Sequence, residues 1–152
     1  MLAIGSPAPD LLMNDENGIP VRLSDRWSKA QLVLFFYPKD DTPGCVAQAC
    51  AFRDEHDRLL EQGKKVIGIS RDGQAPHQRF GQKYRLPFTL LSDPTGEAHK
   101  AYGVGRILGI LPERVTYLID RDGIIIGVHK SSLSPKGHAR FALGSDRGYG
   151  SV

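Results

Sequence analysis

The stretch QLVLFFYPKDDTPGCVAQAC, residues 31–50, joins an apolar run to a polar turn and then to the beginning of a helix. The run QLVLFFY shows no polar alternation, which is typical of a strand buried on both faces of a sheet. Thr42 followed by Pro43 indicates a helix N-cap with proline at the first helical position. Because sites in open α/β sheets form beyond the carboxyl ends of strands, we expect the chemistry to lie just after Tyr37.

Outward from this stretch, the sequence alternates between strand and helix patterns. The predicted elements after the first strand are a helix from about Thr42 to Gln62, a strand at 65–70, a helix from about Ala75 to Tyr84, a strand at 88–92, a helix with Asp93 as N-cap and Pro94 at its first position, and the strands VTYLID and IIIGVHK around the turn RDG. This order predicts a single α/β domain over residues 1–152, with a mixed, mostly parallel sheet, flanking helices and a C-terminal hairpin.

The composition is that of a soluble globular protein, with 40% hydrophobic and 24% charged residues in a chain of 152. No apolar run approaches the roughly 20 residues of a membrane helix, so we expect no membrane contact. The opening MLAIGSPAPDLL lacks the basic start of a signal peptide, which predicts a cytoplasmic protein. A net charge of +3 is too small to indicate nucleic acid as a partner.

Both cysteines of the chain, Cys45 and Cys50, lie at the start of the predicted first helix. In the first turn, unpaired backbone N–H groups and the helix dipole favour an anion, so we expect the pKa of the Cys45 thiol to fall from about 8.5 towards 3.5–7.5. Gly44 allows another molecule to approach the backbone closely. The Thr42 hydroxyl can either cap the helix or donate to a bound oxygen.

The spacing of the two thiols forbids a disulfide while the helix is intact. Positions i and i+5 of a helix lie about 8.6 Å apart between Cα atoms, whereas a disulfide needs less than about 7 Å. Either Cys45 and Cys50 never bond, or the start of the helix must unwind first.

The same spacing separates candidate chemistries. C-x-x-C suits a dithiol oxidoreductase and C-x₄-C does not, and structural zinc sites need more ligands. The five histidines show no ligand spacing and are expected at or near the surface; they are His56, His77, His99, His129 and His138. The sequence therefore predicts no metal and no cofactor. What remains is a thiolate that attacks a peroxide O–O bond, becomes a sulfenic acid and condenses with a second thiol.

The segment FYPKDDTPGC, in which Pro38, Thr42 and Cys45 form P-x-x-x-T-x-x-C, resembles the active-site loop of the peroxiredoxin family. A second cysteine five residues on resembles the peroxiredoxin Q, or bacterioferritin comigratory protein, subfamily. The segments VIGISRD, LPFTLLSDP, AYGV and RVTYLID are similar to segments of that subfamily, so the resemblance runs from about Gly5 to Val128.

The resemblance implies a thioredoxin-like fold and a thiol peroxidase that acts on hydrogen peroxide and organic hydroperoxides. It implies that Cys45 is the peroxidatic cysteine and Cys50 the resolving cysteine, with a disulfide between them that thioredoxin or a similar dithiol reduces. By the same resemblance, Thr42 hydrogen-bonds the peroxide and the thiolate, Pro38 shields the thiolate, and Arg114 pairs with the thiolate and a peroxide oxygen.

The C-terminal residues depart from the family, which usually closes with an amphipathic helix packed on the sheet. Here at most GHARFAL, residues 137–143, can form two turns, so we expect residues 131–152 to be a poorly ordered tail. A dimer contact would be one substitute cover for that face, and we expect a monomer or a weak homodimer.

A thiol redox sensor without turnover is the alternative function. Residues 129–152 carry the whole net charge of +3, and this basic end of the chain is the only feature that favours the sensor. A disulfide isomerase is disfavoured by the C-x₄-C spacing.

Overall fold

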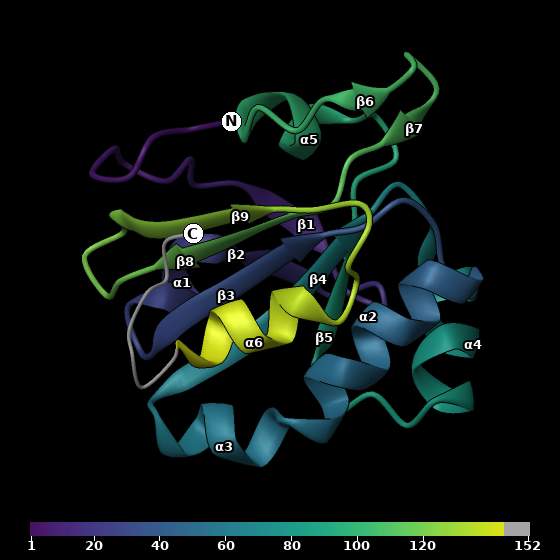
Figure 1. The fold of residues 1–152 in the computed structure, drawn as a ribbon, viewed down its shortest axis with the longest axis horizontal. Helices are drawn as coiled ribbons and strands as arrows, with labels where there is room; N and C mark the ends of the chain where they lie inside the picture. Colours follow the sequence, from purple (N-terminus) through teal and green to yellow (C-terminus); the bar gives the residue numbers. More distant parts are fainter. Residues whose placement is uncertain (145–152) are drawn as a thin grey trace.

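The computed structural model describes residues 1–144 (Figure 1). Its elements in chain order are β1 (Leu12–Asn14), β2 (Pro20–Arg22), α1 (Leu23–Trp27), β3 (Gln31–Phe36), α2 (Pro43–Asp54), α3 (His56–Glu61), β4 (Lys64–Ser70), α4 (Gln74–Lys83), β5 (Thr89–Ser92), α5 (Glu97–Ala101), β6 (Arg106–Ile107), β7 (Leu111–Pro112), β8 (Val115–Ile119), β9 (Ile125–Lys130) and α6 (Gly137–Leu143). Within that part of the chain, every helix is too short or too polar to cross a bilayer.

Seven strands form one mixed sheet in the order β2-β1-β5-β4-β3-β8-β9, and β6 and β7 form a separate small pair. Only β3–β4 and β4–β5 are parallel, whereas β1–β2, β1–β5, β3–β8 and β8–β9 are antiparallel. The mixed sheet and its C-terminal hairpin are confirmed, but the prediction of a mostly parallel sheet is wrong. The three-residue strands β1 and β2 are too short to give a pattern in the sequence, and β8 returns antiparallel beside β3.

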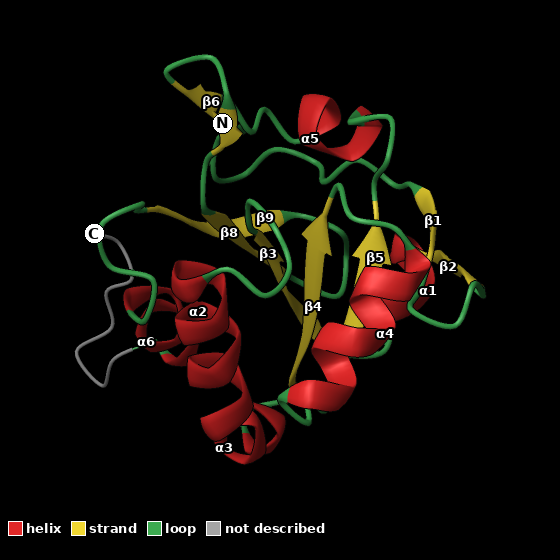
Figure 2. Ribbon diagram, turned by 90° about the vertical axis from the view of Figure 1, so that its right-hand side faces the viewer, coloured by secondary structure: helices red, strands yellow, loops and turns green. Residues whose placement is uncertain are grey.

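The interior strand β3, which lies between β4 and β8, contributes side chains to both layers of the core, because successive side chains of a strand point to opposite faces. Leu32, Leu34 and Phe36 pack in one cluster with α1 and α5. Val33, Phe35 and Tyr37 pack in the other cluster, with α2, α3, α4 and α6. Figures 1 and 2 show these four helices together on one side of the sheet and α5 on the other. The continuous apolar run is therefore buried on both faces, as predicted.

The helix predicted from about Thr42 to Gln62 is two helices. Thr42 is the N-cap of α2 and Pro43 its first residue, as expected, but the helix ends at Asp54. Glu55 ends α2 and begins α3 with φ −99° and ψ 6°, which is not helical backbone. The apolar spacing continued through this break, so the sequence pattern did not reveal it. The next predicted helix is confirmed as α4, to within one residue at either end.

The helix predicted to begin at Pro94 begins at Glu97 instead. Gly96 precedes it in the left-handed region at φ 78°, so a turn separates Asp93 from α5. The Asp93 carboxylate nevertheless accepts hydrogen bonds from the backbone N–H groups of Ala98 and His99 at 3.0 and 2.9 Å. Asp93 therefore satisfies free donors of α5 from outside the helix.

The segment GHARFAL forms α6, which buries His138, Ala139, Phe141 and Ala142. It contacts α2, α3, β8 and β9, so it covers the sheet face for which the sequence offered no cover. The prediction of a poorly ordered tail is therefore wrong for residues 131–144, and its remainder, 145–152, lies outside the described residues. Of the four buried side chains of α6, three are apolar and the fourth, His138, is hydrogen-bonded inside the core.

Candidate active site

The polar turn between β3 and α2 places Cys45 beyond the carboxyl end of β3. Asp41 in this turn has φ 59°, a left-handed conformation that is unusual outside glycine. Its carboxylate accepts hydrogen bonds from Lys83 Nζ at 3.0 Å and from the Tyr84 hydroxyl at 2.9 Å. The bond from Lys83 is the main reason that the pKa of Asp41 lies below its usual value. The end of α4 thus holds the turn in its conformation.

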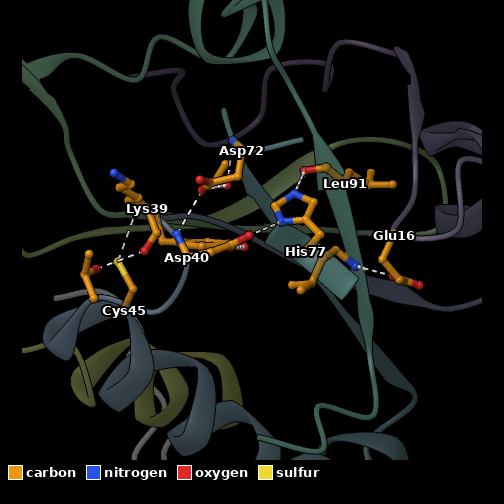
Figure 3. A network of polar contacts seen from close by, with 11 residues as sticks. Glu16, Lys39, Asp40, Cys45, Asp72, His77 and Leu91 are labelled. Atoms are coloured by element: carbon orange, nitrogen blue, oxygen red, sulfur yellow. Dashed lines mark hydrogen bonds and ion pairs between the residues drawn. The ribbon is translucent and has the colours of Figure 1, made fainter. Parts of the chain in front are cut away.

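The Cys45 thiol is buried, with 1% of the residue exposed. Its Sγ accepts a hydrogen bond from the backbone N–H of Lys39 at 3.5 Å and another from Arg114 Nη1 at 3.2 Å (Figure 3 shows the Lys39 contact). A backbone amide and a guanidinium can only donate, so the sulfur is the acceptor in both contacts.

Arg114 lies directly before β8 and reaches across to the start of α2. The same Nη1 that contacts Cys45 donates to Gln48 Oε1 at 2.8 Å. Gln48 is fully buried one turn after Cys45, and its Nε2 has no partner among the described residues. A Cβ at Gly44 would lie 2.4 Å from Arg114 Nη2, so only glycine leaves room for the guanidinium. Sequence reasoning missed Gln48, whose one signal is a polar side chain three positions after Cys45 on the inner face of the helix.

Thr42 and Pro38 flank the thiol. The Thr42 hydroxyl donates to the Lys39 carbonyl at 2.9 Å and makes no bond to the helix backbone, so it is not a side-chain cap. Its lone pairs stay available to accept a further hydrogen bond. Pro38 is half-buried and directly follows Tyr37, a core residue just after the end of β3.

Cys50 lies on a different side of α2 from Cys45. It is half-buried and, like Cys45, a free thiol. It lines a hollow of about 620 Å³ between α2 and α6, to which α6 contributes Ala139 and Arg140. Because α2 is continuous from Pro43 to Asp54, the structure does not bring the two cysteines together.

A buried polar network lies behind the turn (Figure 3). Asp40 accepts hydrogen bonds from the Tyr37 hydroxyl and pairs with His77 Nδ1, both at 2.5 Å. Burial lowers the pKa of His77, but the bond and charge of Asp40 outweigh it, and the net shift is upward. Burial, followed by the charge of Asp40, raises the pKa of Tyr37 well above its ordinary value. The sequence gave no sign of this network, since it joins residues about 40 positions apart.

Three histidines are buried, although all five were expected at or near the surface: His77, His99 and His138. His138 joins α6 to the strand that follows Arg114. Its Nδ1 accepts a hydrogen bond from the Thr116 hydroxyl at 2.8 Å, and its Nε2 donates to the Ser131 carbonyl at 2.8 Å. Burial lowers the pKa of His138 to about 4. The Ser131 N–H donates in turn to the Arg114 carbonyl at 3.3 Å.

Among residues 1–144, no three His, Cys, Asp or Glu side chains are grouped as a metal site would require.

Taken together, the geometry is that of a nucleophile. A buried sulfur lies at the first turn of a helix, between an amide donor and a fixed cation. A cation in this position can also stabilise negative charge that develops on a neighbouring oxygen.

Comparison with known proteins gives this geometry a context. The model of the AhpC/TSA family matches residues 4–128. The chain is 44% identical over 135 residues to chloroplastic peroxiredoxin Q from Arabidopsis thaliana, a match that covers 88% of this chain and 62% of the relative. The chain therefore spans about 62% of the length of this curated relative.

Solved structures of other proteins are also similar to this chain in fold. Peroxidoxin BcpB from Mycobacterium tuberculosis superposes with a TM-score of 0.88 at 37% identity, over 94% of this chain and 95% of the other. The Xanthomonas campestris bacterioferritin comigratory protein, whose structure is described in terms of alkyl peroxide reduction, gives a TM-score of 0.79 at 29% identity, over 88% of this chain and 87% of the other. The predicted thioredoxin-like fold is confirmed by these superpositions.

Proposed function

The chain belongs to the AhpC/TSA family, as a peroxiredoxin of the Q type, and from this premise we propose that it is a thiol-dependent peroxidase. Its substrates are hydrogen peroxide and organic hydroperoxides. The observation that carries the proposal is the 3.2 Å contact between Arg114 Nη1 and the buried Cys45 sulfur.

In the first step, the Cys45 thiolate attacks the terminal oxygen of the hydroperoxide. An S–O bond forms as the O–O bond breaks, the leaving hydroxide or alkoxide takes up a proton, and Cys45 becomes a sulfenic acid. Arg114 is always charged, and its fixed guanidinium suits both the thiolate and the oxygen on which charge develops. The Thr42 hydroxyl donates to the Lys39 carbonyl, so what it offers the peroxide is a lone pair.

The surroundings of the thiol support this step. Only 1% of Cys45 is exposed, which limits competition from water. Arg114 itself is oriented by Gln48, so its position does not depend on the substrate.

In the second step, the Cys50 sulfur attacks the sulfenic sulfur of Cys45, a disulfide forms and water leaves. The first turns of α2 must unwind for this, because the Cα atoms are about 8.6 Å apart in an intact helix. A dithiol reductant such as thioredoxin then restores both thiols. Cys50 lines the open hollow between α2 and α6, which gives such a reductant access to the disulfide.

Mass spectrometry after one equivalent of peroxide tests the proposal. We expect wild-type protein to lose two hydrogens and to yield a peptide in which Cys45 is linked to Cys50. A Cys50→Ser variant is the matched control and should instead gain one oxygen on Cys45. An unmodified Cys45 in either protein would contradict the proposal.

Turnover separates a peroxidase from the sensor alternative. In an assay that couples peroxide to thioredoxin, thioredoxin reductase and NADPH, a peroxidase consumes NADPH continuously, whereas a sensor consumes one equivalent and stops. Two of the basic residues that favoured the sensor, Lys136 and Arg140, line the hollow beside Cys50. Because this hollow is where a reductant would reach the disulfide, the position of these residues suits turnover, and we favour the peroxidase over the sensor. The cytoplasmic location and the monomeric or weakly dimeric state stay predictions.

A further inference from the structure

The buried network behind the turn begins with Asp40, which three separate elements hold. Its carboxylate accepts from the hydroxyl of Tyr37, directly after β3, and pairs with His77 of α4. Its backbone N–H donates to Asp72 Oδ2 at 2.8 Å, in the loop after β4. Both the side chain and the backbone of Asp40 are therefore fixed, and Asp40 is 8% exposed.

The hydrogen bonds of His77 determine its charge. Its Nε2 lies 3.0 Å from the Leu91 carbonyl, and its Nδ1 lies 2.5 Å from the Asp40 carboxylate. A carbonyl and a carboxylate only accept, so both ring nitrogens must carry hydrogen and the ring is an imidazolium. Asp40 and His77 thus form a buried ion pair (Figure 3), and His77 has no exposed surface.

This ion pair lies one residue away from a contact with the reactive sulfur. The N–H of Lys39 donates to Cys45 Sγ at 3.5 Å, and Lys39 directly precedes Asp40. If Asp40 moved, the Lys39 amide would move with it, because a planar peptide joins the two residues.

The charges around His77 also indicate that the ion pair supports the reactive sulfur. The groups that face His77 are Asp40 in the turn, Asp72 after β4 and the Leu91 carbonyl of β5. Without the imidazolium, the two carboxylates would have no cation of the network to offset them, close to a sulfur that must be anionic. The pair therefore keeps excess negative charge away from the thiolate.

We propose that Asp40 and His77 are positioning residues for the peroxidase reaction: their ion pair holds the Lys39 amide on the Cys45 sulfur and neutralises charge beside it. This inference rests on the proposed function and assigns a role to a pair that touches neither the substrate nor the sulfur. Misplacement of a contact by about 1 Å can slow a reaction by about 100-fold. The decrease in rate on loss of the pair should therefore be large enough to measure.

The chain contains a matched control pair. His99 Nδ1 lies 2.6 Å from Asp93 Oδ2, and both residues are buried. His99 packs edge-on against Phe36, whose side chain belongs to the core cluster on the opposite face of the sheet from Cys45. A substitution there removes the same kind of pair without reaching the turn.

The experiment measures the second-order rate of reduced protein with hydrogen peroxide, by competition with a haem peroxidase, between pH 5 and pH 9. His77→Gln, Asp40→Asn and the double variant are compared with wild type and with His99→Gln. We expect the wild-type rate to fall at alkaline pH as His77 loses its proton. His77→Gln should be slower by about 10- to 100-fold at neutral pH and should lack this alkaline fall.

The two residues should act as one unit, so the double variant should be no slower than the slower single variant. His99→Gln should stay within about twofold of wild type. The inference is overturned if folded His77→Gln or Asp40→Asn keeps the wild-type rate, or if the wild-type rate shows no alkaline fall. The pH dependence of the wild-type rate tests the inference even if a variant does not fold. If wild-type Cys45 does not react with peroxide at all, the proposed function fails instead.

Discussion

Substitution of Gly44 by alanine should slow the peroxide reaction without unfolding the protein. A Cβ at this position would lie 2.4 Å from Arg114 Nη2, whereas ordinary contacts begin at 3.4 Å. The guanidinium must therefore withdraw by about 1 Å. The clash falls on the end of a flexible side chain, so Arg114 can move while the backbone stays in place.

The size of the effect follows from the displaced contact. A withdrawal of 1 Å lengthens the bond from Nη1 to Cys45 Sγ from 3.2 Å to about 4.2 Å, beyond hydrogen-bonding distance. Complete loss of one donor of this kind costs about 3 kcal/mol, or about 100-fold in rate. We expect a loss of about 10- to 100-fold, since Arg114 moves but keeps its charge. Stability should change little, because alanine is favoured over glycine in helices by up to about 1 kcal/mol.

The assay is the rate of oxidation of reduced protein by hydrogen peroxide, with urea unfolding measured on the same samples. Gly81→Ala is the matched control, because it also replaces a helical glycine but its Cβ would meet only Leu90 Cδ1 at 4.0 Å. Gly81→Ala should react at the wild-type rate. The reasoning would be refuted by a Gly44→Ala variant that reacts as fast as wild type, or by an equal loss in both variants.

Two further changes test the same site. Arg114→Ala should react with peroxide about 100-fold more slowly, since it removes the charge and the donor together. Substitution of the exposed Arg121 by alanine is the control and should leave the rate unchanged. Equal rates for Arg114→Ala and wild type would disprove the role of Arg114. The neutral His138 ring, whose pKa is lowered from 6.5 to about 4, should stabilise the fold fully above pH 6.5 and lose up to about 3 kcal/mol as the pH falls to 4. Urea unfolding of wild type and His138→Asn should therefore converge between pH 6.5 and pH 4, and a constant difference would contradict this.

The sequence predicted those parts of the fold that depend on local patterns. The apolar run of β3, the cap formed by Thr42 and Pro43, and the turn between β8 and β9 each depend on neighbouring residues, and all three are confirmed. The short strands β1 and β2 and the break at Glu55 were missed, because three residues give no period and the break does not interrupt the apolar spacing.

The site was predicted in part for the same reason. The motif around Cys45 is continuous in sequence, so its position could be read directly. Gln48, Asp40 and His77 could not be identified, because their roles come from contacts with segments up to 66 positions away. A histidine in an amphipathic helix gives no sign of the carboxylate that it will meet.

The first half of α2 is held in place by hydrogen bonds and the second half by apolar packing. The proposed reaction weakens only the hydrogen bonds. Near Cys45, the helix is held by hydrogen bonds to the sulfur from Lys39 and Arg114. Further along, Phe52 is fully buried and stacks on Phe35 with ring centroids 4.5 Å apart, so this half is held by apolar packing. Hydrogen bonds to an ionised group are about twice as strong as neutral ones.

Oxidation to a sulfenic acid removes the negative charge of the sulfur and therefore weakens the contacts of the first half. The apolar packing of the second half is unaffected by this change of charge. Because Cys50 lies between the two halves, unwinding of the first turns can bring Cys45 to it while Phe52 keeps the rest of α2 on the sheet. In the proposed reaction, the thiolate that attacks the peroxide would thus also be the group that keeps the two cysteines apart, and its loss would permit the disulfide.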